Sequence, residues 1–178
     1  MIKLRWFCCL LALVFSSLAS SLETDLDQYK LGAGDVIKIA VFGEPDLSLI
    51  TKLPNLGVIN YPFLGDIAVI GLTASQLEST IYRGLLGDYL VNPSVSVTIE
   101  VYRPFFIDGE VQRPGGYPYQ PSLTVDKAAA LAGGYTERAS KTKIIIRREV
   151  DGQQTNLNAD PNDLVLPGDI VTIQQSFF

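Results

Sequence analysis

The side chains of this sequence that could do chemistry are carboxylates, because none of its 178 residues is histidine. Histidine is the side chain best suited to proton transfer at neutral pH, so its absence excludes serine triads and histidine metal sites. Four carboxylates could supply the acid and base of a glycoside hydrolase: Asp108, Glu110, Asp126 and Glu137. Asp108 and Glu110 lie two apart on an expected strand and would share one face. A solvated strand face explains that pair equally well, and we expect no catalytic residue and no enzyme activity.

The only two cysteines, Cys8 and Cys9, lie inside an apolar run from Trp6 to Leu18 that follows two basic residues. This run is well short of the roughly 20 residues that a membrane-spanning helix needs. The sequence therefore predicts a secretory signal peptide over residues 1–21, with a retained membrane anchor as the alternative. Its removal leaves no thiol, which excludes disulfides, zinc sites and cysteine nucleophiles.

The residues in front of Cys8 do not suit lipid modification. Arg5, Trp6 and Phe7 stand there in place of the small apolar residues of a lipoprotein signal. We therefore expect cleavage after Ala19 or Ser21, by the small-residue rule, and a mature protein that is not a lipoprotein.

Loss of the leader removes two of the 14 basic residues and none of the 19 acidic ones, leaving a net charge near −7. Nucleic acid is then an unsuitable partner, because phosphate binding requires a basic surface. One segment concentrates the remaining cations: Arg138, Lys141, Lys143, Arg147 and Arg148. They could contact an acidic polymer or an acidic face of a neighbouring subunit. A solvated loop and strand is the simpler interpretation.

Tyr117 and Tyr135 are further candidates for a polymer or subunit contact. Aromatic rings stack on sugar faces and are favoured at protein interfaces. Packing of Tyr117 against the adjacent Pro118 is the alternative. The glycine segments Gly32-Ala33-Gly34 and Gly115-Gly116 lack the spacing and the lysine of a phosphate loop. We therefore expect no cofactor, and we also expect no metal.

A Gly-Asp pair precedes a β-rich run three times, at Gly34-Asp35, Gly65-Asp66 and Gly168-Asp169. Each pair predicts a turn that leads into a strand. The three aspartates are expected to bond to their own backbone in these turns rather than to act in catalysis.

The middle of the first half predicts a helix over about residues 74–87. Thr73 to Gln76 has the form of a capping box, and Leu77, Ile81 and Leu85 follow at helical spacing as a stripe that faces the core. Apolar residues then alternate with polar ones from Val95 to Val101, which predicts a strand.

The second half starts where Arg103-Pro104 ends that strand, because proline cannot donate to a sheet. A new extended run covers residues 105–111, and Thr124 can cap a short helix over 125–132. Residues 143–150 and 153–157 flank Asp151-Gly152, a strong hairpin signal. The expected fold class is α+β, with two small domains that each hold a curved, mostly antiparallel sheet and one helix.

Several spaced positions resemble the outer-membrane polysaccharide export family, whose members carry a polysaccharide-export domain followed by a β-grasp (SLBB-like) domain. They include the segment from Gly109 to Tyr117, with its Pro114-Gly115 turn, and Gly133-Gly134-Tyr135. The other matching positions are Tyr29, Leu31, Gly34, Asp35, Val41, Leu47, Gly57, Ile59, Pro62, Gly65, Gly71, Thr73, Leu77, Pro93, Arg103, Ala132, Ala139 and Arg147. Leu56 stands where the family has an aspartate, which leaves the local turn open.

The resemblance implies a polysaccharide-export domain over residues 24–103 and an SLBB-like β-grasp domain over 104–178. It further implies a periplasmic, outer-membrane-associated component of capsular or exopolysaccharide export that assembles as a ring. The longer relatives add β-grasp repeats and a pore helix, so we expect a short adaptor that works with an outer-membrane barrel, an inner-membrane copolymerase and the polysaccharide. A periplasmic β-grasp module that binds a soluble ligand or sugar is the alternative.

Overall fold

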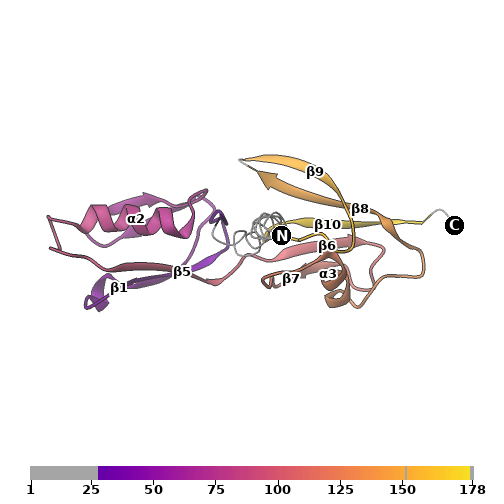
Figure 1. Ribbon diagram of the computed structural model, residues 1–178, viewed down its shortest axis with the longest axis horizontal. Helices are drawn as coiled ribbons and strands as arrows, with labels where there is room; N and C mark the ends of the chain where they lie inside the picture. The colour runs from indigo at the N-terminus through magenta and orange to yellow at the C-terminus, as the bar shows by residue number, and fades with distance from the viewer. Residues whose placement is uncertain (1–27, 151, 177–178) are drawn as a thin grey trace, which may run out of the picture.

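The computed structural model describes residues 28–150 and 152–176, which form two units arranged end to end (Figure 1). Each unit has its own hydrophobic core. The first core is built from side chains between Tyr29 and Val97, and the second from side chains between Phe105 and Ile173. The polypeptide passes from one unit to the other at Tyr102, Arg103 and Pro104.

The first unit contains a three-stranded antiparallel sheet in the order β2-β1-β5. Its central strand β1 (Val36–Val41) pairs with β2 (Leu49–Lys52) on one side and with β5 (Val95–Val101) on the other. A short 3-10 turn, η1 (Pro45–Leu47), joins β1 to β2. The strand expected over 95–101 is confirmed, and β5 is an edge of this sheet.

A hairpin of β3 (Val58–Tyr61) and β4 (Gly65–Ala68) and the helix α2 (Ala74–Leu85) complete the first unit. The turn before this hairpin forms although Leu56 replaces the family's aspartate: Leu56 is 90% exposed, and Gly57 takes a positive φ of 70°.

The start and the buried stripe of α2 are confirmed. The Thr73 side chain accepts a hydrogen bond from Gln76 N, and the Gln76 side chain accepts one from Thr73 N, which completes the capping box. Leu77, Ile81 and Leu85 are fully buried. The helix ends two residues before the expected position, because Leu86 is already extended.

The second unit holds a five-stranded sheet in the order β7-β6-β10-β8-β9. The strands are β6 (Phe105–Gly109), β7 (Gly115–Tyr117), β8 (Ala139–Val150), β9 (Gln153–Ala159) and β10 (Ile170–Gln175). The β10–β6 pair is parallel and the other pairs are antiparallel. The predicted hairpin is confirmed, and the end of β8 and β9 near residue 152 projects from the body of the unit (Figure 1). The α+β class and the single helix per unit are therefore correct.

The helix α3 (Val125–Leu131) is capped by Thr124, as predicted, and ends one residue before the expected position. Gly133 and Gly134 after it both have positive φ. Backbone hydrogen bonds join residues 110–113 to residues 132–136, including Gln112 N to Gly134 O at 3.0 Å. The two glycine-containing segments that resemble the family thus meet in space, and they hold α3 beside the sheet.

Gly109 is the last residue of β6, and its positive φ of 80° turns the chain out of the strand. A side chain there would collide with the carbonyl oxygen of Ile173. Glu110 consequently lies beyond the strand, where its Oε2 accepts a hydrogen bond from the Thr136 hydroxyl. The expectation that Asp108 and Glu110 share one strand face is therefore wrong.

Candidate functional site

Three of the five basic residues predicted from the sequence form a row along β8. Ile144 and Ile146 face the core, so the residues that alternate with them point to the opposite face of the sheet. Lys141, Lys143 and Arg147 occupy that outer face, and all three are exposed. Lys143 and Arg147 are separated by about 13 Å at the usual rise of a strand. They are therefore spaced along the sheet rather than clustered at one point.

Arg148 points to the other face and has a structural role. Its Nη2 atom lies 2.7 Å from Asp169 Oδ2, and its Nε atom lies 3.0 Å from Asp169 Oδ1. Asp169 is buried and also accepts a hydrogen bond from Leu166 N at 2.7 Å. Arg148 is therefore engaged in holding the turn that precedes β10, and it does not extend the row.

The two candidate tyrosines lie apart from each other. The Tyr135 hydroxyl donates to Asp126 Oδ1 at 2.7 Å, and Lys141 Nζ lies 5.1 Å from the centre of the Tyr135 ring. Burial, with the hydrogen bond to Asp126, raises the pKa of Tyr135. Tyr135 thus adjoins one end of the basic row, near the exposed Arg138.

Tyr117 belongs to the inner side of the sheet. It is directly opposite Phe105 in the β6–β7 pair, and the two rings stack with centroids 6.0 Å apart. Its hydroxyl donates to Arg113 O at 2.6 Å. Because Phe105 faces the core, Tyr117 is not on the face that carries Lys143 and Arg147.

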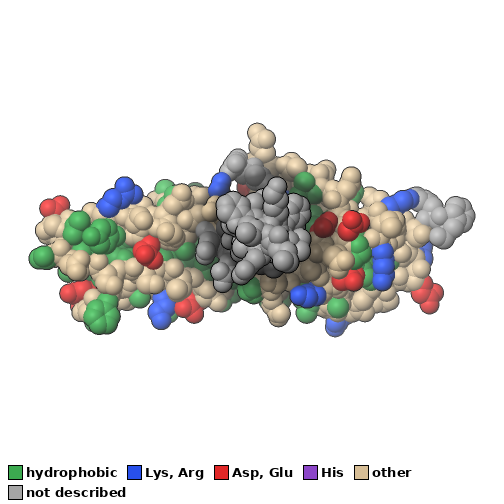
Figure 2. Space-filling model, viewed as in Figure 1, with side chains coloured by type: hydrophobic (Ala, Val, Ile, Leu, Met, Phe, Trp, Pro, Cys, Tyr) green, Lys and Arg blue, Asp and Glu red, His purple; other side chains and the backbone are tan. Residues whose placement is uncertain are grey.

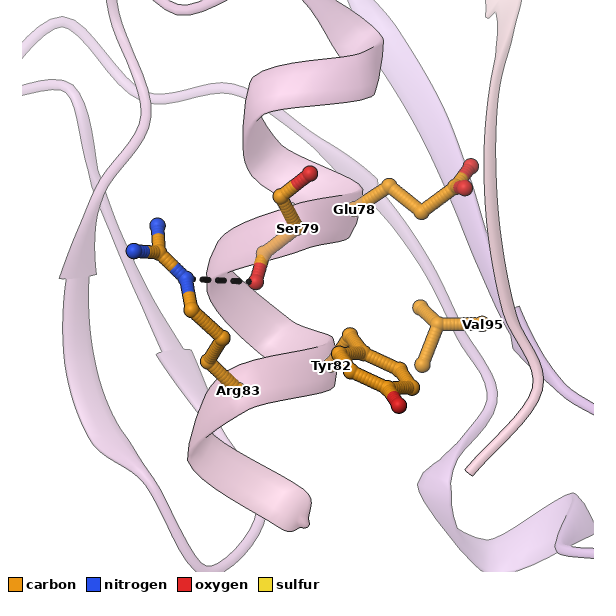
Figure 3. Close-up of a pocket in the computed structure, with 5 residues that line it drawn as sticks. All are labelled: Glu78, Ser79, Tyr82, Arg83 and Val95. Carbon is orange, nitrogen blue, oxygen red and sulfur yellow. Dashed lines mark hydrogen bonds between the residues drawn. The ribbon is translucent and has the colours of Figure 1, made fainter. Parts of the chain in front are cut away.

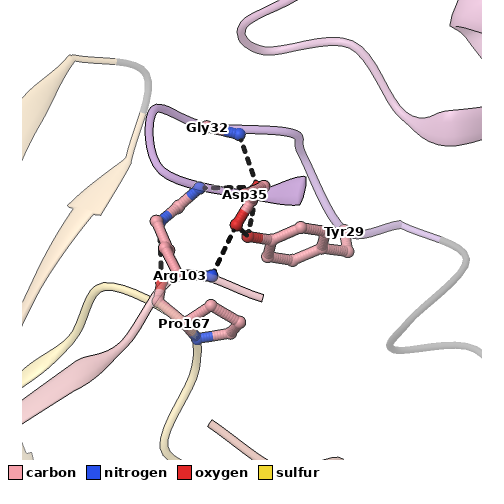
Figure 4. A network of polar contacts seen from close by, with 5 residues as sticks. All are labelled: Tyr29, Gly32, Asp35, Arg103 and Pro167. Carbon is pink, nitrogen blue, oxygen red and sulfur yellow. Dashed lines mark hydrogen bonds and ion pairs between the residues drawn. The ribbon is translucent and has the colours of Figure 1, made fainter. Parts of the chain in front are cut away.

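The most highly connected polar site lies at the junction of the two units (Figure 4). Asp35 is fully buried, and its carboxylate accepts hydrogen bonds from the Tyr29 hydroxyl at 2.8 Å and from Gly32 N at 2.8 Å. It also accepts from the backbone N of Arg103 at 2.7 Å and forms an ion pair with Arg103 Nη1 at 3.3 Å. The carboxylate thereby fixes the start of β1 to the end of the first unit.

Arg103 extends this network into the second unit. Its Nε donates to Pro167 O at 3.2 Å, and its guanidinium lies 5.4 Å from the centre of the Tyr29 ring. A side chain at Gly32 would collide with the guanidinium, and one at Gly168 would come within 2.6 Å of Nε. The two glycines therefore leave the space that Arg103 occupies.

The junction also carries a chain of aromatic contacts. The Tyr102 ring lies 5.2 Å from the Tyr29 ring in the first unit and 5.3 Å from the Tyr119 ring in the second, both edge to face. Burial, followed by the charge of Asp35, raises the pKa of Tyr29 well above its ordinary value. Burial, followed by the charge of Asp35, also raises the pKa of Tyr102.

The expected turn role is confirmed for two of the three Gly-Asp aspartates. Asp35 accepts from Gly32 N, and Asp169 accepts from Leu166 N, so each carboxylate bonds to the backbone three residues before it. Asp66 differs, because it lies within β4 and accepts a hydrogen bond from the Asn60 side chain at 2.9 Å. Sequence reasoning missed that each buried aspartate also binds an arginine.

Shallow hollows open on the surface of the described residues. One of about 570 Å³ lies beside α2 and β5 and is lined by Glu78, Ser79, Tyr82, Arg83 and Val95 (Figure 3). Tyr82 lies beside Val95 and Glu78 extends toward β5, whereas Arg83 lies on the other side of the helix. The second hollow, of about 430 Å³, adjoins α3 at Leu123, Lys127 and Leu131.

Within residues 28–150 and 152–176, no helix is both long and apolar enough to cross a membrane. In the same part of the chain, no three side chains of the metal-binding types converge as they would around an ion.

Two family models match the chain in sequence order. The model of polysaccharide biosynthesis/export proteins matches residues 23–100, and the SLBB domain model matches residues 104–157. The two matches meet at the junction that contains Arg103.

Curated relatives agree with these matches. The chain is 36% identical to the exopolysaccharide production protein ExoF of Rhizobium meliloti over 61% of this chain and 28% of that protein. It is 27% identical to the EPS I polysaccharide export outer membrane protein EpsA of Ralstonia nicotianae over 83% of this chain and 47% of that protein. It is also 27% identical to the polysialic acid transport protein KpsD of Escherichia coli over 79% of this chain and 25% of that protein.

The chain therefore spans from about a quarter to about half of the length of these relatives. The two matched domains, their order and the names of the relatives together confirm the resemblance stated from the sequence: the chain belongs to the polysaccharide biosynthesis/export protein family and carries an SLBB domain.

Proposed function

We propose that the mature chain is a periplasmic, outer-membrane-associated component of a capsule or exopolysaccharide export machinery, in which it acts as a ring-forming adaptor. The observation that carries the proposal is the succession of an export domain and an SLBB domain, in relatives named for polysaccharide export or transport. The proposal assigns residues 1–21 to a leader, 24–103 to the export domain and 104–178 to the SLBB-like domain.

The surface of the first unit supports a role in assembly. Phe42 follows β1 and Val91 precedes β5 at the end of this unit remote from the junction, and they are 88% and 94% exposed. Apolar side chains are visible at this end (Figure 2). Exposed apolar patches commonly mark surfaces that a partner covers. A closed ring requires one patch of each subunit to meet a different patch of the next.

The row on β8 is the part of the surface that we assign to the polymer or to a neighbouring subunit. Lys141, Lys143 and Arg147 are spaced along one exposed face, and Arg138 and Tyr135 adjoin its end. Separate cations along a strand would hold an acidic chain weakly at several points. Weak binding at many sites allows transport, whereas tight binding at one site would stop it.

Deletion of the gene tests the proposal. A deletion strain should keep its polysaccharide inside the envelope, and the intact gene should restore export. Normal export by the deletion strain would refute the proposal. In parallel, sedimentation of the purified mature chain should give a mass of several subunits. A monomer that binds one small sugar saturably would instead favour a soluble binding module.

The partners can be tested in the same strain. We expect an affinity-tagged mature chain to co-purify, after cross-linking in cells, with an outer-membrane barrel and an inner-membrane copolymerase. Glu substitution of Lys141, Lys143 and Arg147 should reduce export while leaving the folded state intact, because these side chains lie on the solvent side of β8. Unchanged export by that variant would remove the row from the proposal.

A further inference from the structure

The strand β9 is an open sheet edge of unusual composition. It pairs with β8 on one side only, from Val150↔Gln153 to Ile144↔Ala159. Two residues connect the strands, so Gln153 belongs to a hydrogen-bonded pair and the pairs alternate from there. The backbone N–H groups of Gln154, Asn156 and Asn158 consequently point away from β8.

Edge strands are usually guarded against pairing by charges, proline, a bulge or short length. β9 has seven residues, Gln-Gln-Thr-Asn-Leu-Asn-Ala, with no charge and no proline. All of them except Ala159 are exposed. Such a strand can add to another sheet through its backbone.

The first unit offers a matching edge in β5, which is also seven residues long and pairs only with β1. Phe42 N donates to Ser94 O, and the alternation from this bond directs the N–H groups of Val95, Val97 and Ile99 away from β1. Glu78 Oε2 accepts from Val97 N at 3.3 Å, so a side chain caps the middle of this edge in the isolated chain. The hollow in Figure 3 lies beside the same edge.

The charges beside the two edges are complementary. Arg147 is directly opposite Asn156, at the middle of β9, and it is exposed. Glu78 lies at the middle of β5, and within the described residues neither Glu78 nor Arg147 forms a salt bridge. If β9 paired with β5, the strand carrying Arg147 would lie two strand spacings from Val97, about 10 Å. An arginine side chain can reach the Glu78 carboxylate across that distance.

We propose that the β9 edge of one copy adds to the β5 edge of the next copy, and that Arg147 then pairs with Glu78. This inference rests on the proposed head-to-tail assembly and supplies its contact. The two edges belong to different units of the chain, so a copy bound through β9 still has its β5 edge open. The contact therefore repeats until the assembly closes.

A matched pair of variants tests the role of the β9 backbone. Asn156→Ala removes the side chain and keeps the N–H, whereas Asn156→Pro removes both. Neither variant disturbs the hairpin, because this N–H is not used by β8, and far-UV circular dichroism of both should match the unmodified chain. In sedimentation velocity, the alanine variant should assemble normally. The proline variant should need an about tenfold higher concentration for half assembly. Equal assembly of the two variants would overturn the inference.

Cross-linking can identify the partner edge through a new covalent product, whereas the previous test depends on a loss of assembly. The mature chain lacks cysteine if the leader is removed, since Cys8 and Cys9 are the only two. Thr155 is the matched position on β9, because it lies on the face opposite to Arg147, as Ser96 lies on the face of β5 opposite to Val97 and Glu78. A mixture of Ser96→Cys and Thr155→Cys chains should form heterodimers with a short bismaleimide, and neither variant alone should be cross-linked. Cross-linking of Thr155→Cys with itself would show a symmetric β9–β9 contact and would overturn the inference.

Charge reversal tests the Arg147–Glu78 pair itself, and its outcome can be distinguished from a general failure of assembly. Arg147→Glu should weaken assembly, and adding Glu78→Arg in the same chain should restore it. Normal assembly by the proline variant and absence of the mixed cross-link would refute the β9–β5 contact while leaving a ring intact. An unmodified chain that stays monomeric at every concentration would instead refute the proposed ring, and the contact with it.

Discussion

Replacing Asp35 by asparagine should remove a large part of the stability of the first unit. Four donors converge on this buried carboxylate: Tyr29 Oη, Gly32 N, Arg103 N and Arg103 Nη1. Asparagine has the same shape, but it offers one acceptor oxygen and turns an NH₂ group toward the remaining donors. Gly32 N and the guanidinium use Oδ2 whereas Arg103 N uses Oδ1, so in either orientation of the amide at least one buried backbone donor loses its acceptor, and the guanidinium loses its counter-charge. We expect a loss of about 3 kcal/mol in the free energy of unfolding.

The other two Gly-Asp aspartates provide matched controls. Asp169→Asn should cost a similar amount, because that carboxylate is also buried and holds Arg148. Asp66→Asn should cost about 0.5 kcal/mol or less, because Asp66 is exposed and, among the described residues, its carboxylate bonds to the exposed Asn60 side chain rather than to a buried donor. Urea unfolding followed by far-UV circular dichroism measures all three, since the only tryptophan, Trp6, lies in the predicted leader. Equal losses for the Asp35 and Asp66 variants would show that burial and the arginine contact do not stabilise the turn.

Three further measurements test the cores and the junction. Burial and Asp35 raise the pKa of Tyr29, so the unfolded chain loses this proton first and stability should fall above pH 10. The free energy of unfolding, measured by urea titration at pH 9 to 11, should therefore decrease with pH. Tyr29→Phe should make this decrease shallower by up to about 1.4 kcal/mol per pH unit, and an unchanged pH dependence would contradict the assignment. Gly109→Ala should cost about 3 kcal/mol or more, because of its positive φ and the Ile173 carbonyl, and a normal melting temperature would contradict this. Ile81→Ala should lower the free energy of unfolding by about 2 to 5 kcal/mol, as judged by chemical unfolding. A loss below about 1 kcal/mol would mean that the apolar stripe of α2 does not belong to the core.

The parts of the fold that local signals specify could be predicted from the sequence. The capping box at Thr73, the buried stripe of α2, the alternation in β5 and the Asp151-Gly152 hairpin each depend on residues within a few positions of one another. The family could also be recognised from spaced glycines and prolines. Their structural basis is that residues 110–113 bond to residues 132–136.

The sequence did not indicate the contacts that join distant segments. Arg103 is 68 residues from Asp35 and 64 from Pro167, and nothing in its neighbours identifies either partner. The sequence placed Arg148 in one basic cluster with Arg147. Neighbouring residues of a strand point to opposite faces, but the sequence did not show which of the two faces is turned inward, and so it did not show that Arg148 is the residue that reaches the buried Asp169. Glu110 was placed on a strand that Gly109 ends, since a single glycine does not reveal the carbonyl opposite it.

The way Arg103 bridges the two units has a consequence for any closed assembly. If copies join end to end, the angle between the two units of each subunit contributes to the rotation from one subunit to the next. That rotation determines how many subunits close the ring. The Arg103 guanidinium lies beside Gly32 and Gly168 and bonds to Asp35 in one unit and to Pro167 in the other, so we expect it to fix that angle. The number of subunits in the proposed ring would then depend partly on one arginine side chain within each monomer.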